Sequence, residues 1–188
     1  MKDAPISRDE QLKLLGWARA AIATAVRGEQ PPRIAEGELT NCSRANHGAF
    51  VTLRKHGELR GCIGKMDFER PLWQNVQDAA VLSATDDPRF LPVSPEELTD
   101  LSLEISVLNP PVDLPDPSLF DVAIHGIIAQ RGMQHALLLP KVAQEQGWDA
   151  RMMLEAVCEK AGLPADAWRD PSTKLQTFTA FEFGEKDM

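Results

Sequence analysis

The sequence has few cysteines and no long apolar run. Its three cysteines, Cys42, Cys62 and Cys158, are odd in number and widely spaced, which fits neither a disulfide framework nor a structural zinc site. No stretch approaches the roughly 18 apolar residues that a membrane-spanning helix needs, and the first residues lack the apolar segment of a signal peptide. We therefore expect a cytoplasmic protein with reduced thiols and no membrane contact.

Clustered positive charge is also missing. The net charge is −8 and the basic residues are scattered, with only close groups such as Arg54-Lys55. Affinity for nucleic acid and for anionic lipid depends largely on clustered Lys and Arg. We therefore expect no nucleic-acid binding, while a local basic pocket stays open as an alternative.

The composition is that of a globular domain. A hydrophobic fraction of 43% supplies a core, and a charged fraction of 26% is ordinary. A chain of 188 residues is within the range of one domain. We expect a single domain over residues 1–188, ordered from about 8 to 185, without internal repeats.

Helix signals occur in both halves of the chain. Ser7 and Glu10 have the spacing of a capping box, and the apolar residues that follow predict a helix over residues 8–27, ended by Gly28. Residues 33–47 are expected to be a loop. Further helices are predicted from Pro71 to the break at residues 86–88, from Pro140 to Glu145, and over residues 151–161 with Asp149 as N-cap.

Strand signals occur between these helices. His56-Gly57 predicts the turn of a hairpin between a strand around Phe50 and Leu53 and the segment 59–64. Period-two alternation predicts a strand over residues 101–107, and further strands are predicted over residues 122–129, 133–139 and 174–183. No βαβ series with a phosphate-binding loop is present. The pattern favours the α+β class, with an antiparallel or mixed sheet flanked by helices.

The segment Leu59-Arg60-Gly61-Cys62-Ile63-Gly64 and several flanking motifs resemble the AMMECR domain family. The flanking motifs, in chain order, are Gly48-Ala49-Phe50-Val51-Thr52-Leu53, Asp87-Pro88-Arg89-Phe90, Glu104-Ile105-Ser106-Val107-Leu108, Leu139-Pro140-Lys141-Val142-Ala143 and Gly147-Trp148-Asp149. The resemblance implies a two-part α+β fold, in which a larger and a smaller subdomain enclose a cleft near this segment. It assigns no reaction.

Two features of the resemblance concern the site and its partners. This chain has Ser83 where a small Ala is common in the family. It also has Lys141 where a Gln is common, and this second difference argues against a shared role for position 141. Prokaryotic relatives include the "A" component of the AmmeMemoRadiSam gene cluster. The resemblance therefore suggests Memo-like and radical-SAM proteins as partners.

The glycines beside Cys62 leave the backbone approachable. Amides around Gly61 and Gly64 could form an anion-binding nest, to which Arg60 would add a charge-assisted donor for a carboxylate or phosphate ligand. Alternatively, the glycines permit a bulge or tight packing, and Arg60 pairs with a surface acid.

Cys62 is a candidate nucleophile if a neighbouring base or cation lowers the pKa of its thiol. His47, His56 and His125 are the available histidines, but no recognised catalytic spacing links them to Cys62. Free cysteines are more often small buried hydrophobes. Cys42, His47 and Cys62 do not complete a four-ligand metal site, and we assign no metal and no cofactor.

Asp87, Arg89 and Glu104 are the remaining candidates. The rigid Pro88 could direct Asp87 and Arg89 into the cleft as a charged pair, or the two could form an internal salt bridge while Phe90 anchors the core. Glu104 lies on the polar face of its strand, where it is either solvent-exposed or a general base.

Two functions remain open at this point. The first is the binding or transformation of a small anionic ligand at Arg60, Gly61, Gly64, Asp87 and Arg89, with Cys62 and Glu104 as catalytic candidates. The second is a non-catalytic interaction module that acts with Memo-like and radical-SAM proteins.

Overall fold

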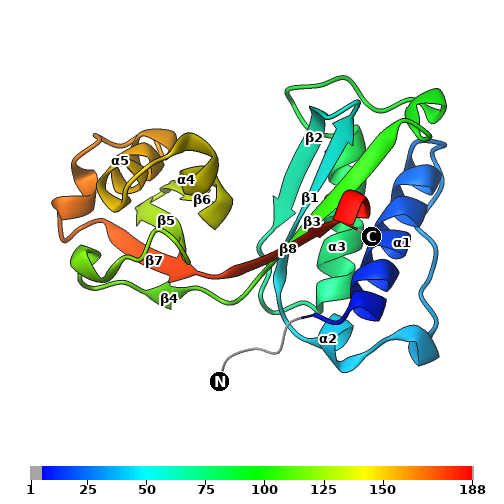
Figure 1. Ribbon diagram of the computed structural model, residues 1–188, viewed down its shortest axis with the longest axis horizontal. Coiled ribbons are helices and arrows are strands. Elements are labelled where there is room, and N and C mark those ends of the chain that lie inside the picture. Colours follow the sequence, from blue (N-terminus) through cyan, green and yellow to red (C-terminus); the bar gives the residue numbers. More distant parts are fainter. Residues whose placement is uncertain (1–5, 188) are drawn as a thin grey trace. The chain divides into compact units, whose positions relative to one another are not determined.

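The computed structural model describes residues 6–187 and divides the chain into two compact units. Unit 1 consists of two chain segments, one that ends at Leu108 and one that begins at Phe181. Unit 2 consists of Asn109–Ala180. Each unit has its own four-stranded sheet and its own hydrophobic core (Figure 1). The α+β class and the two-part organisation are therefore confirmed.

Unit 1 combines α-helices and short 3-10 turns with a sheet of strand order β2-β1-β3-β8. Its helical elements are α1 (Arg8–Ala25), η1 (Glu36–Glu38), α2 (Asn41–Arg44), α3 (Leu72–Thr85), η2 (Pro95–Glu97) and η5 (Glu185–Asp187). Its strands are β1 (Gly48–Lys55), β2 (Glu58–Lys65), β3 (Leu101–Leu108) and β8 (Ala180–Gly184).

Local signals account for the first helix and for the hairpin. The capping box is formed, since Glu10 N–H donates to Ser7 Oγ while Ser7 N–H donates to the Glu10 carboxylate. His56 and Gly57 have φ values of 53° and 89° in the turn between β1 and β2. A two-residue turn with positive φ at both positions matches the twist of antiparallel strands, so the turn sets the register of this hairpin.

The sheet of unit 1 has two different faces. Ala49, Val51 and Leu53 of β1 are fully buried in the core with α1 and α3, which both pack on this side (Figure 1). Side chains alternate along a strand, so their neighbours point to the opposite side. We call this opposite side the non-helical face; on the three paired strands it carries Phe50, Thr52, Arg54, Cys62, Gly64, Ser102, Glu104 and Ser106.

Unit 2 has a sheet of strand order β4-β7-β5-β6. Its strands are β4 (Val112–Asp113), β5 (Gly126–Arg131), β6 (Gln134–Leu138) and β7 (Lys174–Phe178), and its helical elements are η3 (Pro117–Leu119), α4 (Pro140–Gln146), α5 (Ala150–Lys160) and η4 (Ala167–Arg169). The side chain of Asp149 caps α5 by accepting Met152 N–H at 2.8 Å, as predicted. Ile127, Met153 and Val157 are central members of the core.

Three expectations for the secondary structure are wrong. The loop predicted over residues 33–47 contains α2, which Thr40 and Ser43 cap reciprocally. The strand predicted from Val122 begins at Gly126, because the carboxylate and carbonyl of Asp121 accept the N–H groups of residues 123–125, which form a turn before the strand.

The third correction concerns residues 174–183, which were predicted as one strand. They form β7 in the sheet of unit 2 and β8 in the sheet of unit 1. The change occurs at Thr179, whose carbonyl accepts Asn109 N–H at 3.0 Å and whose hydroxyl accepts Asn109 Nδ2 at 2.8 Å. These bonds hold the two chain segments together where both leave unit 2.

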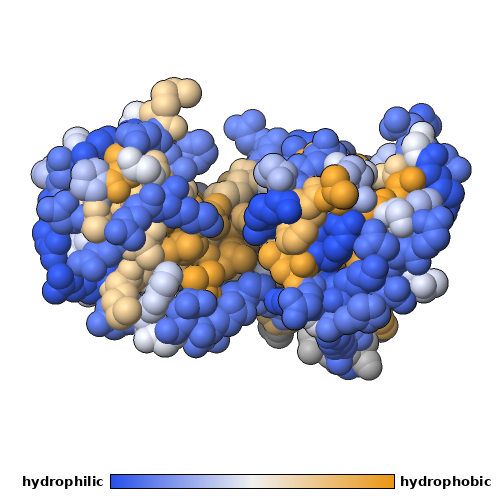
Figure 2. Space-filling model, turned by 90° about the horizontal axis from the view of Figure 1, so that it is seen from above, coloured by the Kyte–Doolittle hydropathy of each residue, from blue (hydrophilic) through white to orange (hydrophobic). Residues whose placement is uncertain are grey.

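Hydrophilic residues cover most of the face seen in Figure 2, with hydrophobic residues gathered in patches. Among residues 6–187, no helix combines the length and apolar character that a bilayer crossing requires.

Candidate functional site

The backbone N–H and carbonyl of Cys62 are both hydrogen-bonded to side chains. Inside a sheet, a neighbouring strand would provide these bonds. Cys62 lies on β2, at the edge of the sheet. Its N–H donates to Oδ2 of Asp87 at 2.8 Å, and its carbonyl accepts from Nη2 of Arg89 at 3.2 Å. The two side chains therefore close the edge of β2 at Cys62 and leave neither backbone group unsatisfied.

Asp87 and Arg89 also bind each other. Nε and Nη2 of Arg89 donate to the two carboxylate oxygens of Asp87 at 3.0 and 2.7 Å. The Asp87 side chain is 2% exposed, whereas that of Arg89 is 54% exposed. The guanidinium of Arg89, with the amides of Cys62 and Arg89, holds the pKa of Asp87 well below its usual range. Asp87 is thus a fixed anion and not a proton donor near neutral pH.

Arg89 binds both Asp87 and the backbone carbonyl of Cys62. The hydrogen bond to Asp87 raises the pKa of Arg89. No hydrogen-bond partner for Nη1 of Arg89 is found among residues 6–187. Arg89 therefore keeps an exposed donor on the residue that binds the Cys62 backbone.

Gly61 permits close contact between the sheet and α3. A Cβ at this position would lie 2.1 Å from the carbonyl oxygen of Ser83. The hydroxyl of Ser83 accepts Ile63 N–H at 2.8 Å and donates to the Val51 carbonyl at 2.8 Å, so it bridges β2 and β1. Ser83, noted above as a departure from the family pattern, thus forms a hydrogen-bonded link between the strands.

Gly64 makes room for an aromatic ring. A Cβ at Gly64 would lie 2.3 Å from the ring of Phe50, which is its partner across the two strands. The ring therefore packs over the β2 backbone on the non-helical face. Because side chains two positions apart share a face, Phe50 lies on the same side of the sheet as Cys62.

Arg60 has a different set of partners. It lies where the register between β1 and β2 shifts, and its Nε and Nη2 donate to the carboxylate of Glu97 at 3.0 and 2.9 Å. Arg60 and the neighbouring amide of Ser94, with a contribution from Lys55, lower the pKa of Glu97 to about 2. The guanidinium of Arg60 is thus neutralised by an acid of unit 1.

Cys62, Thr52 and Glu104 form a row across three strands. Thr52 is the register partner of Cys62 on one side and of Glu104 on the other. Its hydroxyl donates to Sγ of Cys62 at 3.3 Å, whereas the carboxylate of Glu104 accepts from Nε of Arg54 at 2.6 Å. Neighbouring strands lie about 4.8 Å apart, so the thiol and the carboxylate are on one face, two strand spacings apart, with the buried Thr52 between them.

The structure brings some of the predicted site residues together and separates others. Cys62, Asp87 and Arg89 form one hydrogen-bonded group, and Glu104 shares a face with Cys62. Gly61 and Gly64 serve close packing, and Arg60 binds Glu97. The described hydrogen-bond partner of the thiol is Thr52 and not a histidine. Within residues 6–187, no cluster of three or more His, Cys, Asp or Glu side chains could hold a metal ion.

Sequence reasoning missed Thr52 and Glu97, and it noted Ser83 without predicting its contacts. The hairpin register, counted outward from the His56-Gly57 turn, could have placed Thr52 beside Cys62 if the shift at Arg60 had been known. Ser83 and Glu97 lie 20 and 37 positions from their partners, and no local pattern reports such contacts.

Comparisons with known proteins agree on one family. The AMMECR1 family model matches residues 15–183. A protein of Methanothermobacter thermautotrophicus is 47% identical over 98% of this chain and 99% of its own length, and Protein TK0174 of Thermococcus kodakarensis is 42% identical over 92% and 89%. The crystal structure of the uncharacterized protein PH0010 from Pyrococcus horikoshii matches with a TM-score of 0.86 and 38% identity, over 93% of this chain and 90% of that one.

Proposed function

The chain belongs to the AMMECR1 family, and we propose that its unit 1 binds a small anionic ligand beside Cys62, on the non-helical face. In this proposal Arg89 supplies the donor for a carboxylate or phosphate group. Cys62 supplies a thiol that contacts the ligand, and Glu104 supplies a carboxylate on the same face; these two side chains are the catalytic candidates. We also propose that the protein works in the cytoplasm, where reducing conditions keep Cys62 a free thiol.

The observation that carries the proposal is the fixation of Cys62. Asp87 and Arg89 hold its N–H and carbonyl, and Ser83 holds the amide of the next residue. A thiol that serves only to fill space does not require its backbone to be held by an ion pair with a buried carboxylate. A binding or catalytic group does gain from such support, because its position must be accurate to within about 0.5 Å.

The anionic character of the ligand rests on Arg89. Arg60, the other guanidinium of the motif, is bound in two places by Glu97 and has only 15% of its side chain exposed. Arg89 is half exposed and has Nη1 available. Gly61 and Gly64 support the proposal indirectly, since they allow α3 and Phe50 to approach the strand that carries the thiol.

Native mass spectrometry of the untagged protein from its own host tests this proposal. We expect wild-type protein to carry a bound small-molecule mass that Arg89→Gln and Cys62→Ser each reduce. Arg44→Gln is the matched control, because Arg44 forms an exposed pair with Glu36 away from the site. Wild-type protein without a bound mass, or variants that retain it in full, would contradict the proposal.

A second candidate is an interaction module for Memo-like and radical-SAM proteins. It is favoured by exposed apolar side chains next to the motif, since Leu91 is 84% exposed directly after the Asp87–Phe90 turn and Leu59 precedes Arg60 on β2. Exposed apolar groups are typical of docking surfaces when they gather. The same mass spectra decide between the two functions. The second function would be favoured by a bound partner protein that is lost in the Leu91→Ser variant, with no small-molecule mass in the wild type.

A further inference from the structure

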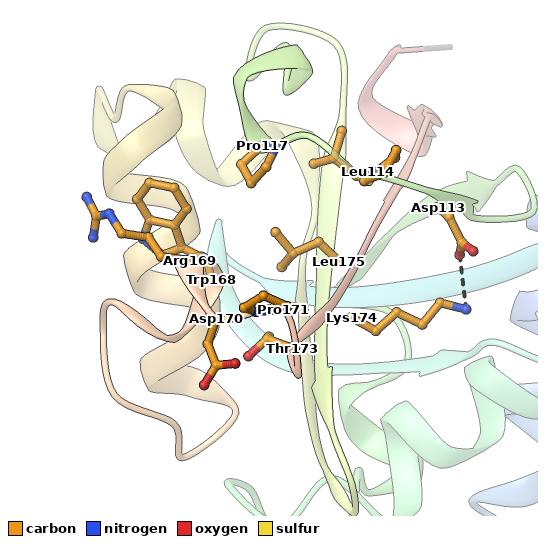
Figure 3. Close-up of a pocket in the computed structure, with 11 residues that line it drawn as sticks. Asp113, Leu114, Pro117, Trp168, Arg169, Asp170, Pro171, Thr173, Lys174 and Leu175 are labelled. Atoms are coloured by element: carbon orange, nitrogen blue, oxygen red, sulfur yellow. Dashed lines mark ion pairs between the residues drawn. The ribbon is translucent and has the colours of Figure 1, made fainter.

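Unit 2 contains an open hollow of about 720 Å³, which is within the usual range of small-molecule sites. Its floor is apolar and includes Leu114, Leu175 and Trp168, all of which belong to or pack against the core of unit 2. Pro117 and Pro171 stand on opposite sides of it (Figure 3). Residues of the hydrophobic core of unit 2 therefore form the base of the hollow.

The walls are held in place without a ligand. Arg131 donates from Nε and Nη2 to Thr173 Oγ1, and from Nη2 to the carbonyl of Ala167 in η4. It also forms an ion pair with Asp170 at 3.1 Å. One guanidinium thus fixes the segment from η4 to the start of β7, and a preformed site loses less entropy when it binds a ligand.

A cationic side chain stacks on the Trp168 ring. The guanidinium carbon of Arg169 lies 3.9 Å from the centre of a Trp168 ring, which is stacking distance. Nε1 of Trp168 is buried and has no partner among the described residues. Trp168 therefore offers no free N–H to the hollow, and the Arg169 guanidinium lies against its ring on the side away from Leu175 (Figure 3).

The remaining charges around the hollow cancel. Lys174 pairs with Asp113 at 3.0 Å, as the dashed line in Figure 3 shows, and Asp170 pairs with Arg131. No ion pair or hydrogen bond of the Arg169 guanidinium is found within residues 6–187. An apolar floor with one uncompensated guanidinium at its rim fits a flat apolar ligand that carries one negative charge.

We propose that this hollow is a binding site for a small aromatic carboxylate. The aromatic ring lies beside the Trp168 indole at the edge of the hollow, and the carboxylate extends past the indole to accept two N–H bonds from Arg169. An Arg fork binds a carboxylate in two places while its plane stacks on an aromatic ring. The site lies wholly in unit 2 and does not depend on the function proposed for Cys62.

The test uses 1-naphthoate and its neutral counterpart 1-naphthamide as probes. Titrations are followed by ¹H–¹⁵N spectra of the full chain, in which the four tryptophans give four indole N–H signals. We expect naphthoate to shift the Trp168 signal, assigned with Trp168→Phe, and to bind about tenfold or more tightly than naphthamide, since hydrogen bonds to a charged group contribute that much.

Variants of Arg169 make the test specific. Arg169→Gln should remove the preference for naphthoate, and Arg169→Lys should retain only part of it. Arg151→Gln on α5, another exposed arginine of unit 2, and Cys62→Ser in unit 1 should leave both affinities unchanged. Equal binding of the two probes, an unmoved Trp168 signal, or full naphthoate affinity in Arg169→Gln would each overturn the proposal.

Discussion

Asp87 accepts the backbone N–H of Cys62 through its Oδ2 at 2.8 Å, across 25 positions of sequence. The contact joins the turn after α3 to the edge strand of the unit 1 sheet. Because the carboxylate also binds Arg89, which in turn donates to the Cys62 carbonyl, an ion pair between a buried acid and a half-exposed guanidinium takes the place of a neighbouring strand. The stability of the motif and the position of the thiol therefore depend on the same three residues.

Asp87→Asn should lower the free energy of unfolding by about 2–3 kcal/mol, because it weakens charged hydrogen bonds at a buried site. Urea denaturation of the purified variant measures this change. Asp86→Asn is the control, since Asp86 is exposed and should change stability by less than about 0.5 kcal/mol. Equal effects of the two substitutions would show that the Asp87 pair does not hold the motif.

Acid should destabilise the protein in a range set by Asp87 and Glu97. The pKa of each carboxyl is lower in the folded chain than its ordinary value, for Glu97 about 2 in place of 4.5. A lowered folded-state pKa gives stability that is fully present above the unfolded pKa and is lost as pH falls. The free energy of unfolding should thus decrease from about pH 4.5 toward pH 2.

Glu97→Gln isolates one part of this dependence. We expect the variant to show a shallower loss of stability in that acid range, whereas Glu58→Gln at the exposed end of β2 should follow the wild type. Denaturation curves at several pH values provide the comparison. A Glu97→Gln profile parallel to that of wild type would mean that the Arg60–Glu97 pair contributes nothing to folding.

Gly61→Ala should destabilise unit 1 by about 2–3 kcal/mol, because the added methyl group meets the Ser83 carbonyl oxygen and α3 must move. Gly16→Ala provides a matched control on α1. No atom lies within 4 Å of a Cβ at Gly16, so this change should stabilise the helix by up to about 1 kcal/mol. Thermal unfolding of both variants would show opposite shifts; a neutral Gly61→Ala would contradict the close packing of α3 on β2.

Local chemistry made much of the fold predictable. The Ser7–Glu10 capping box and the His56-Gly57 turn act within a few residues, and both appear in the structure as expected. The division of residues 174–183 between two sheets could not be predicted, because alternation has the same period in both strands. What separates them is the contact of Thr179 with Asn109, 70 positions away.

Sequence motifs named three residues that the structure places in contact, but did not show how they are arranged. The motif pointed to Cys62, Asp87 and Arg89, and these residues are in contact. Sequence could not show that Glu97 binds Arg60, because many acids were available and the pairing depends on where η2 lies. Nor could it show that Thr52 stands between Cys62 and Glu104, since one bulge changes which residues share a face.

The most direct test of the account is the rate at which iodoacetamide alkylates each cysteine of the native protein, followed by peptide mass spectrometry. Burial raises the pKa of the Cys42 thiol to about 11 and also raises that of Cys158, so both should hold little reactive thiolate. We predict that Cys62 reacts first and that Arg89→Gln changes the Cys62 rate alone. Alkylation of Cys42 or Cys158 ahead of Cys62 would contradict the claim that the hairpin presents a thiol for binding.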